Sequence, residues 1–152
     1  MFNVVLYQPE IPPNTGNIIR LCANTGCLLH LVEPLGFDLN DKKLRRAGLD
    51  YHEWADVKIH PDLDAACGSG GKVYAISTRG SRLYSDVHYN PGDTLLFGPE
   101  TRGLPDHYLD SVDREQILRI PMLRHSRSLN LSNAVAVVVY EGLRQNRFAD
   151  RC

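Results

Sequence analysis

The sequence lacks the features that identify membrane, zinc and disulfide proteins. Its longest apolar run is far too short to cross a bilayer. No signal peptide is recognisable, so we expect a cytoplasmic protein with free thiols. No two cysteines form a C-x-x-C pair and no histidine cluster accompanies them, which argues against any metal site. The four cysteines are Cys22, Cys27, Cys67 and Cys152.

A strong excess of charge of one sign is also missing. The chain has 17 Lys and Arg against 18 Asp and Glu, for a formal net charge of −1 with its six histidines neutral. Bulk charge therefore cannot carry nucleic-acid binding, although a local basic patch can. The run K-K-L-R-R at 42–46 is one candidate for such a patch, and a solvated helix face is the alternative.

Three common nucleotide and hydrolase motifs are absent. No G-x-G-x-x-G follows the first predicted strand, so a nicotinamide site is unsupported. The glycines at 98 and 103 have the spacing of a phosphate loop, but Leu104 and Pro105 stand where Lys and Ser or Thr are required. G-x-S-x-G does not occur, and a hydrolase built on His125 and Ser126 remains an alternative.

What the sequence does contain is an alternation of short apolar runs and helical patterns. In a chain of 152 residues this predicts a single domain, residues 1–152, of the α/β class, with a mostly parallel sheet and helices on both faces. The expected strands are 3–7, 28–33, 57–60, 72–77, 94–97 and 116–120, and the expected helices are 14–25, 41–47, 61–67, 105–109 and 134–145. Polar, Gly-rich segments follow the last three strands, which is where the site of a parallel sheet is expected.

The stretch from Ile120 to Arg144 joins a polar loop to an apolar helix. Asn130 or Ser132 can cap this helix, which leaves backbone N–H groups available to a ligand in the loop. An ordinary capped core helix is the alternative. The run V-A-V-V-V-Y also suits a strand, but the length and the caps favour a helix. Asn14 or Thr15 is expected to cap the first helix, and Gly26 to end it.

Three segments taken together carry a family resemblance. They are N-T-G-N-I-I-R at 14–20, L-L-F-G-P-E-T-R-G-L at 95–104 and I-P-M-L-R-H-S-R-S-L-N-L-S-N-A at 120–134. This set resembles the SPOUT superfamily of RNA methyltransferases, and within it the small tRNA ribose 2′-O-methyltransferases of the wobble position. The resemblance covers essentially the whole chain. It departs slightly at L-R-H, residues 123–125, because the residues before Ser126 are more basic in this chain than in the family.

The resemblance implies a C-terminal trefoil knot and S-adenosylmethionine as the methyl donor, with no metal. The knot rests on the resemblance alone, because knotted chains are almost absent among proteins. Gly98 would let the backbone approach the ligand, with a turn glycine as the alternative. Glu100 and Arg102 would pair with each other or orient the site. The implied donor-binding residues are Ile76, Thr78, Gly98, Glu100, Ile120, Met122, Ser128, Leu129 and Ala134.

The implied reaction is methyl transfer to the ribose 2′-OH of a wobble cytidine or modified uridine, with leucine tRNAs as the expected substrates. In the family, the residue that matches Arg20 is credited with activating this hydroxyl. Because arginine is almost always protonated, stabilising the alkoxide or relaying its proton to an RNA phosphate is physically easier. A surface ion pair of Arg20 with Glu10 or another acid is the alternative. Asn14 would hold Arg20 or the ribose, and Ser128 and Asn130 would complete the catalytic group.

The resemblance also implies a homodimer that binds tRNA, with no further protein partner. The last helix, with Val135, Val138 and Val139, would supply either core or dimer interface, and Tyr140 an edge contact. Two alternatives stay open: an RNA-binding protein that keeps the fold without the reaction, and a 2′-O-methyltransferase of another RNA site. The expected RNA contacts are Lys42, Lys43, Arg45, Arg46, Arg127 and Tyr140.

Overall fold

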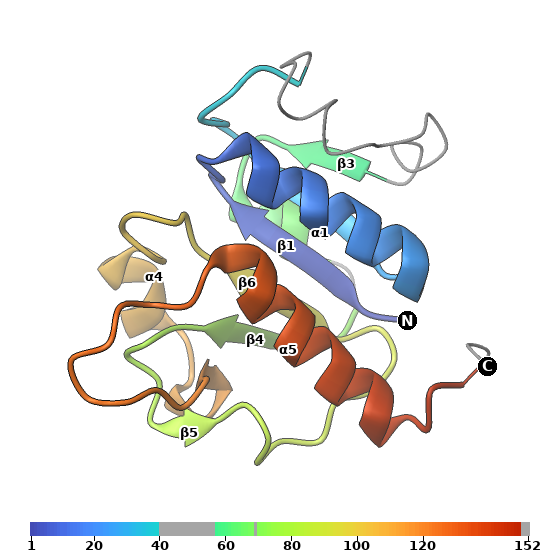
Figure 1. Ribbon diagram of the computed structural model, residues 1–152, viewed down its shortest axis with the longest axis vertical. Coiled ribbons are helices and arrows are strands. Elements are labelled where there is room, and N and C mark those ends of the chain that lie inside the picture. Colours follow the sequence, from blue (N-terminus) through green and yellow to red (C-terminus); the bar gives the residue numbers. More distant parts are fainter. Residues whose placement is uncertain (40–56, 69, 150–152) are drawn as a thin grey trace.

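A sheet of seven strands forms the centre of the computed structural model (Figure 1). The structure describes residues 1–39, 57–68 and 70–149. The strand order is β3-β2-β1-β6-β4-β7-β5, and every pairing is parallel. Buried parallel strands are expected to be continuously apolar, and all four residues of β6 are buried. The strands are β1 (Asn3–Tyr7), β2 (Leu28–Val32), β3 (Val57–His60), β4 (Val73–Ile76), β5 (Arg82–Leu83), β6 (Thr94–Phe97) and β7 (Ile117–Arg119).

Helices cover both faces of this sheet, as the sequence predicts. Helices α1 (Pro12–Thr25) and α5 (Leu131–Gln145) lie side by side over one face (Figure 1). The three valines at 135, 138 and 139 are completely buried there, so they belong to the core of this chain. Helices α3 (Leu63–Cys67) and α4 (Asp106–Ser111) pack on the other face, and a 3-10 turn (Arg114–Gln116) precedes β7.

The two long helices begin in different ways. Asn130 caps α5, because its Oδ1 accepts the backbone N–H of Ser132 at 3.0 Å. The expected cap of α1 by Asn14 or Thr15 is wrong: Ile11 occupies the cap position without a side-chain bond, and two prolines open the helix. Proline is tolerated in the first turn since its missing N–H would have no partner there. Asn14 and Thr15 are therefore buried inside the helix.

Other differences from the predicted elements are small. Strand β5 was not expected, and α5 begins three residues earlier than predicted. The expected helix 41–47 lies outside the described residues. Gly26 ends α1 in the left-handed conformation, with φ 68°, as predicted. None of the helices in the described ranges is long and apolar enough to cross a membrane.

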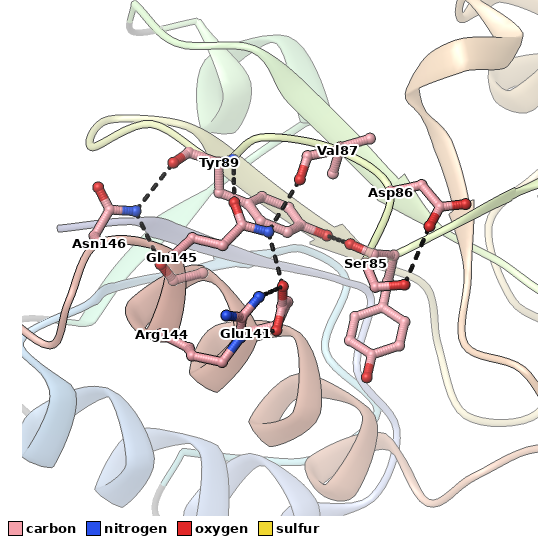
Figure 2. A network of polar contacts seen from close by, with 10 residues as sticks. Ser85, Asp86, Val87, Tyr89, Glu141, Arg144, Gln145 and Asn146 are labelled. Atoms are coloured by element: carbon pink, nitrogen blue, oxygen red, sulfur yellow. Dashed lines mark hydrogen bonds and ion pairs between the residues drawn. The ribbon is translucent and has the colours of Figure 1, made fainter.

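The segment that follows β5 is fastened to the end of α5 (Figure 2). Gln145 donates from Nε2 to the carbonyl of Val87 at 3.0 Å and accepts the backbone N–H of Tyr89 at 3.0 Å. Asn146 donates to the carbonyl of Tyr89 at 3.0 Å. The ring of Tyr89 is fully buried, and its hydroxyl donates to the carbonyl of Tyr84 at 2.6 Å. The last helix and this segment therefore form one packed unit.

Candidate functional site

A cavity of about 470 Å³ opens at the carboxyl ends of four adjacent strands, β1, β6, β4 and β7. Its lining comes from the last residues of β4 and β6, from the segments that follow the four strands and from the first turn of α5. The volume lies in the range of roughly 300–1,000 Å³ that is usual for small-molecule sites. This edge is also where open parallel sheets place their ligands.

The nine residues that the resemblance assigns to donor binding all line this one cavity, as do Asn14 and Asn130. Arg20 is not among the lining residues and lies on the exposed side of α1. Arg127 is exposed in the loop before α5, and the side chain of Tyr140 is half exposed on α5. The basic cluster 42–46 lies outside the described residues. The structure thus brings the predicted donor group together in space, and its ligand stays a prediction.

Gly98 is required by the path of its own loop. A Cβ atom at this position would lie 2.3 Å from the nitrogen of Leu104 and 2.4 Å from the carbonyl carbon of Gly103. The loop returns on itself because the N–H of Gly103 donates to the carbonyl of Pro99 at 3.0 Å. Gly98 was explained either by close approach of the ligand or by a turn. The contacts within the chain require glycine here because of the turn.

A chain of hydrogen bonds joins the three sequence segments at the cavity. Asn130 donates from Nδ2 to Oδ1 of Asn14 at 2.9 Å, and Asn14 donates from Nδ2 to Oε1 of Glu100 at 3.2 Å. The oxygen of Asn130 accepts from both the N–H and the hydroxyl of Ser132. Because each amide donates on one side and accepts on the other, the orientation of both amides is fixed.

Glu100 is the end of this chain. Its carboxylate accepts the backbone N–H groups of residues 10 and 11, at 2.8 and 3.1 Å, in addition to the amide of Asn14. Hydrogen bonds to a carboxylate are stronger than those between neutral groups. Of the two alternatives for Glu100 and Arg102, pairing with each other is not what the structure has, because the guanidinium of Arg102 donates to Oε1 of Gln8.

The loop at residues 121–130 is exposed along its whole length, although it forms one wall of the cavity. Met122 and Leu129, which line the cavity, are 38% and 42% exposed. Leu123 is 87% exposed, at a turn in which Ser126 donates to its carbonyl. Exposed apolar groups beside a cavity are what a bound ligand would cover.

The residue-by-residue prediction missed several lining residues. Seven of them lie within the second and third segments, so treating each segment as a continuous wall would have found them, whereas Ser77 and Ile11 lie outside all three segments. Within the described part of the chain, no group of three or more His, Cys, Asp or Glu side chains could hold a metal ion. The missed residues are Ile11, Ser77, Phe97, Pro99, Thr101, Arg102, Gly103, Leu104 and Leu131.

Curated relatives match the chain over nearly its full length. The tRNA (cytidine(34)-2'-O)-methyltransferase of Escherichia coli (strain K12) is 59% identical over 147 residues, which is 95% of this chain and 94% of that protein. The protein of the same name from Methylovorus glucosotrophus is 56% identical over 151 residues, 98% of each chain.

Solved structures and a family model agree with these relatives. One structure, which concerns the 2-OH methylation of C/U34 on tRNA, is 46% identical, has a TM-score of 0.88 and shares 97% coverage of both chains. An AdoMet-bound rRNA methyltransferase from Sinorhizobium meliloti is 27% identical with a TM-score of 0.79, over 94% of this chain and 56% of that one. The model of the SpoU rRNA Methylase family matches residues 1–140. The chain therefore belongs to the SpoU rRNA Methylase family, which confirms the resemblance to RNA methyltransferases seen in its sequence.

Proposed function

We propose that this protein methylates the ribose 2′-OH of nucleotide 34 in tRNA, a cytidine or modified uridine, with S-adenosylmethionine as donor. The family model carries rRNA in its name, whereas relatives 56–59% identical over nearly the whole chain are named as tRNA (cytidine(34)-2'-O)-methyltransferases. The relatives are the better guide to the substrate, because 56–59% of their aligned residues are identical to those of this chain. The observation that carries the proposal is the hydrogen-bonded chain from Asn130 through Asn14 to Glu100 beside the cavity. Leucine tRNAs are the proposed substrates.

The cavity fits a nucleoside-bearing donor. Ile76, Ile120, Leu129 and Ala134 provide an apolar slot for a purine, and the backbone that carries them can supply hydrogen-bonding groups to its edge. Support comes from the Sinorhizobium meliloti rRNA methyltransferase, a structural neighbour that is AdoMet-bound. When bound, S-adenosylmethionine supplies a methyl group on a positively charged sulfur, and the sulfur keeps the electron pair when the methyl leaves.

The residues of the chain would orient the ribose and accommodate its charge. The 2′-oxygen forms a bond to the methyl carbon, and its proton passes to water or to an RNA phosphate. Arg20 stabilises the negative charge on this oxygen or passes the proton to an RNA phosphate. Asn14, whose amide is fixed from both sides, holds the ribose or Arg20, and Ser128 and Asn130 complete the group. Positioning supplies the larger part of the acceleration, since effective molarities reach about 10⁵–10⁸ M.

The other parts of the proposal concern assembly and RNA. The chain acts as a single-domain cytoplasmic homodimer with a C-terminal trefoil knot. Because the buried valines of α5 serve the core, the exposed side chains of Val137 and Tyr140, 37% and 50% exposed, are the proposed dimer contacts on that helix. The tRNA contacts are the cluster 42–46, Arg127 and Tyr140, and affinity should fall with salt as phosphates are contacted.

The test is methyl transfer to tRNA of defined sequence. Purified protein with labelled donor should add one methyl group to a leucine tRNA that has cytidine at position 34. The same tRNA with 2′-deoxycytidine at that one position is the matched control and should remain unlabelled. Methylation of another nucleotide would show that position 34 is not the target. Donor binding without any methylation of the tRNA would favour an RNA-binding role.

A further inference from the structure

The further inference deepens the proposed function and rests on it. We infer that Glu10 is a positioning residue, which sets the distance between the donor-side loop, residues 98–103, and the start of α1 on the acceptor side. Glu10 does not line the cavity, so it acts through the residues that do.

The two segments start from neighbouring strands. Strands β1 and β6 pair in parallel, with Leu6 beside Phe97, so the segments that follow them leave the same edge of the sheet. The segment after β6 becomes the donor-side loop. The segment after β1 leads directly into α1, which carries Asn14 and Arg20. Any shift between these segments therefore changes the distance between donor and acceptor groups.

A reciprocal exchange of carboxylates ties the two segments together. The carboxylate of Glu10 accepts the hydroxyl of Thr101 at 2.7 and 3.0 Å and its backbone N–H at 3.3 Å. In return, the carboxylate of Glu100 accepts the backbone N–H of Glu10 at 2.8 Å. The guanidinium of Arg102 lies 3.9 Å from the Glu10 carboxylate, and the attraction between these opposite charges also holds the two segments together.

The segment that carries Glu10 is itself fixed from behind. The N–H of Gly36 donates to the carbonyl of Pro9 at 2.9 Å, and the N–H of Gln8 donates to the carbonyl of Val32 at 3.0 Å. A Cβ on Gly36 would come within 2.8 Å of the Cα of Glu10, so the packing there is close. The Glu10 side chain is only 24% exposed. It is therefore a fixed point against which Thr101, a lining residue, is held.

Removing this contact should affect transfer more than donor binding. The donor cavity keeps its other walls, but the loop can then move relative to α1. A displacement of about 1 Å between reacting groups can cost about 10²-fold in rate. We expect Glu10→Ala to lower the single-turnover rate about 10–100-fold while the donor Kd changes less than about threefold. Glu10→Gln should keep most of the rate, because its amide can accept the N–H of Thr101 and donate to its hydroxyl oxygen.

The experiment measures single-turnover methyl transfer at saturating donor and tRNA, per donor-binding site counted by calorimetry. Thr101→Val is the partner variant, and the Glu10→Ala/Thr101→Val double variant should be no slower than the slower single variant if both act through one contact. Glu115→Ala is the matched control: Glu115 pairs with Arg82 at 3.0 Å, is 71% exposed and does not line the cavity, so its rate should match wild type.

Two results would overturn the inference. One is a Glu10→Ala rate within twofold of wild type per binding site. The other is an equal loss of rate and donor affinity, with the effects of the two single variants multiplying in the double variant. If Glu10→Ala does not fold, Thr101→Val and Glu10→Gln decide by the same comparison of rate with affinity. An inactive wild-type protein would instead refute the proposed function, which keeps the two failures distinct.

Discussion

Replacing Gly98 by alanine tests whether the shape of the donor-side loop is set by the backbone alone. The added methyl would lie 2.3 and 2.4 Å from two backbone atoms, of Leu104 and Gly103. That is about 1 Å short of ordinary van der Waals contact, and no side-chain rotation can relieve it. The loop must therefore open by a similar amount. Overpacking of this kind costs about 1–3 kcal/mol of stability, and the cavity wall moves with the loop.

Gly103→Ala is the matched variant in the same loop. Gly103 has φ 69°, and no heavy atom lies within 4 Å of its added Cβ. Its cost is conformational, about 1–2 kcal/mol for a left-handed residue with a side chain. Gly103→Asn should recover part of this cost, because asparagine tolerates that conformation better than alanine does.

Thermal unfolding and calorimetry with S-adenosylhomocysteine separate the two effects. We expect both alanine variants to lose stability, and only Gly98→Ala to lose donor affinity by more than about tenfold, which corresponds to about 1.4 kcal/mol. Gly103→Ala should bind within about threefold of wild type. Wild-type affinity in Gly98→Ala, or an equal loss in Gly103→Ala, would refute the argument that contacts at residue 98 shape the donor site.

Three further predictions concern catalysis, pH and assembly. Arg20→Ala should keep donor affinity and lower the single-turnover rate about 10²–10⁴-fold, with poor rescue by lysine; a wild-type rate would remove Arg20 from the mechanism. Burial, with His60 and Lys58 nearby, lowers the pKa of His30 to about 4 in the folded chain. Between pH 6.5 and pH 4, His30 is therefore protonated in the unfolded chain but neutral in the folded chain. The contribution of neutral His30 to the free energy of unfolding is fully present above pH 6.5, and it should fall by about 2–3 kcal/mol as the pH drops to 4. If the free energy of urea unfolding depended on pH equally in wild type and in His30→Gln, that result would contradict this prediction. Tyr140→Glu should weaken the proposed dimer at least tenfold by light scattering, and a wild-type monomer at micromolar concentration would contradict the dimer itself.

Elements with a strong local pattern could be predicted from the sequence. The apolar runs at 3–7 and 94–97 became buried parallel strands with the expected bounds. Strand β5 could not be predicted, because its two residues have no apolar pattern and only its pairing with β7 defines it. The start of α1 was misplaced because Asn14 suits a cap in isolation, while its amide is engaged by groups far along the chain.

The site shows the same division between local and long-range information. Seven of the nine residues predicted to bind the donor stand together in the second and third segments, and all nine line one cavity. The role inferred for Glu10 depends on β1 and β6 being neighbours in the sheet, about 90 positions apart in the chain. Neither composition nor spacing encodes that neighbourhood, since strand order is decided by the packing of the whole sheet.

The chain of amides from Asn130 through Asn14 to Glu100 also limits how this protein can diverge. An aspartate at position 14 would remove the donor to Glu100 and bring two carboxylates together, unless position 100 became an amide in the same lineage. A change at position 130 would in addition disturb the start of α5. Drift at any one of these positions is therefore held back by the other two. Among descendants of this sequence we expect the three to change together or not at all.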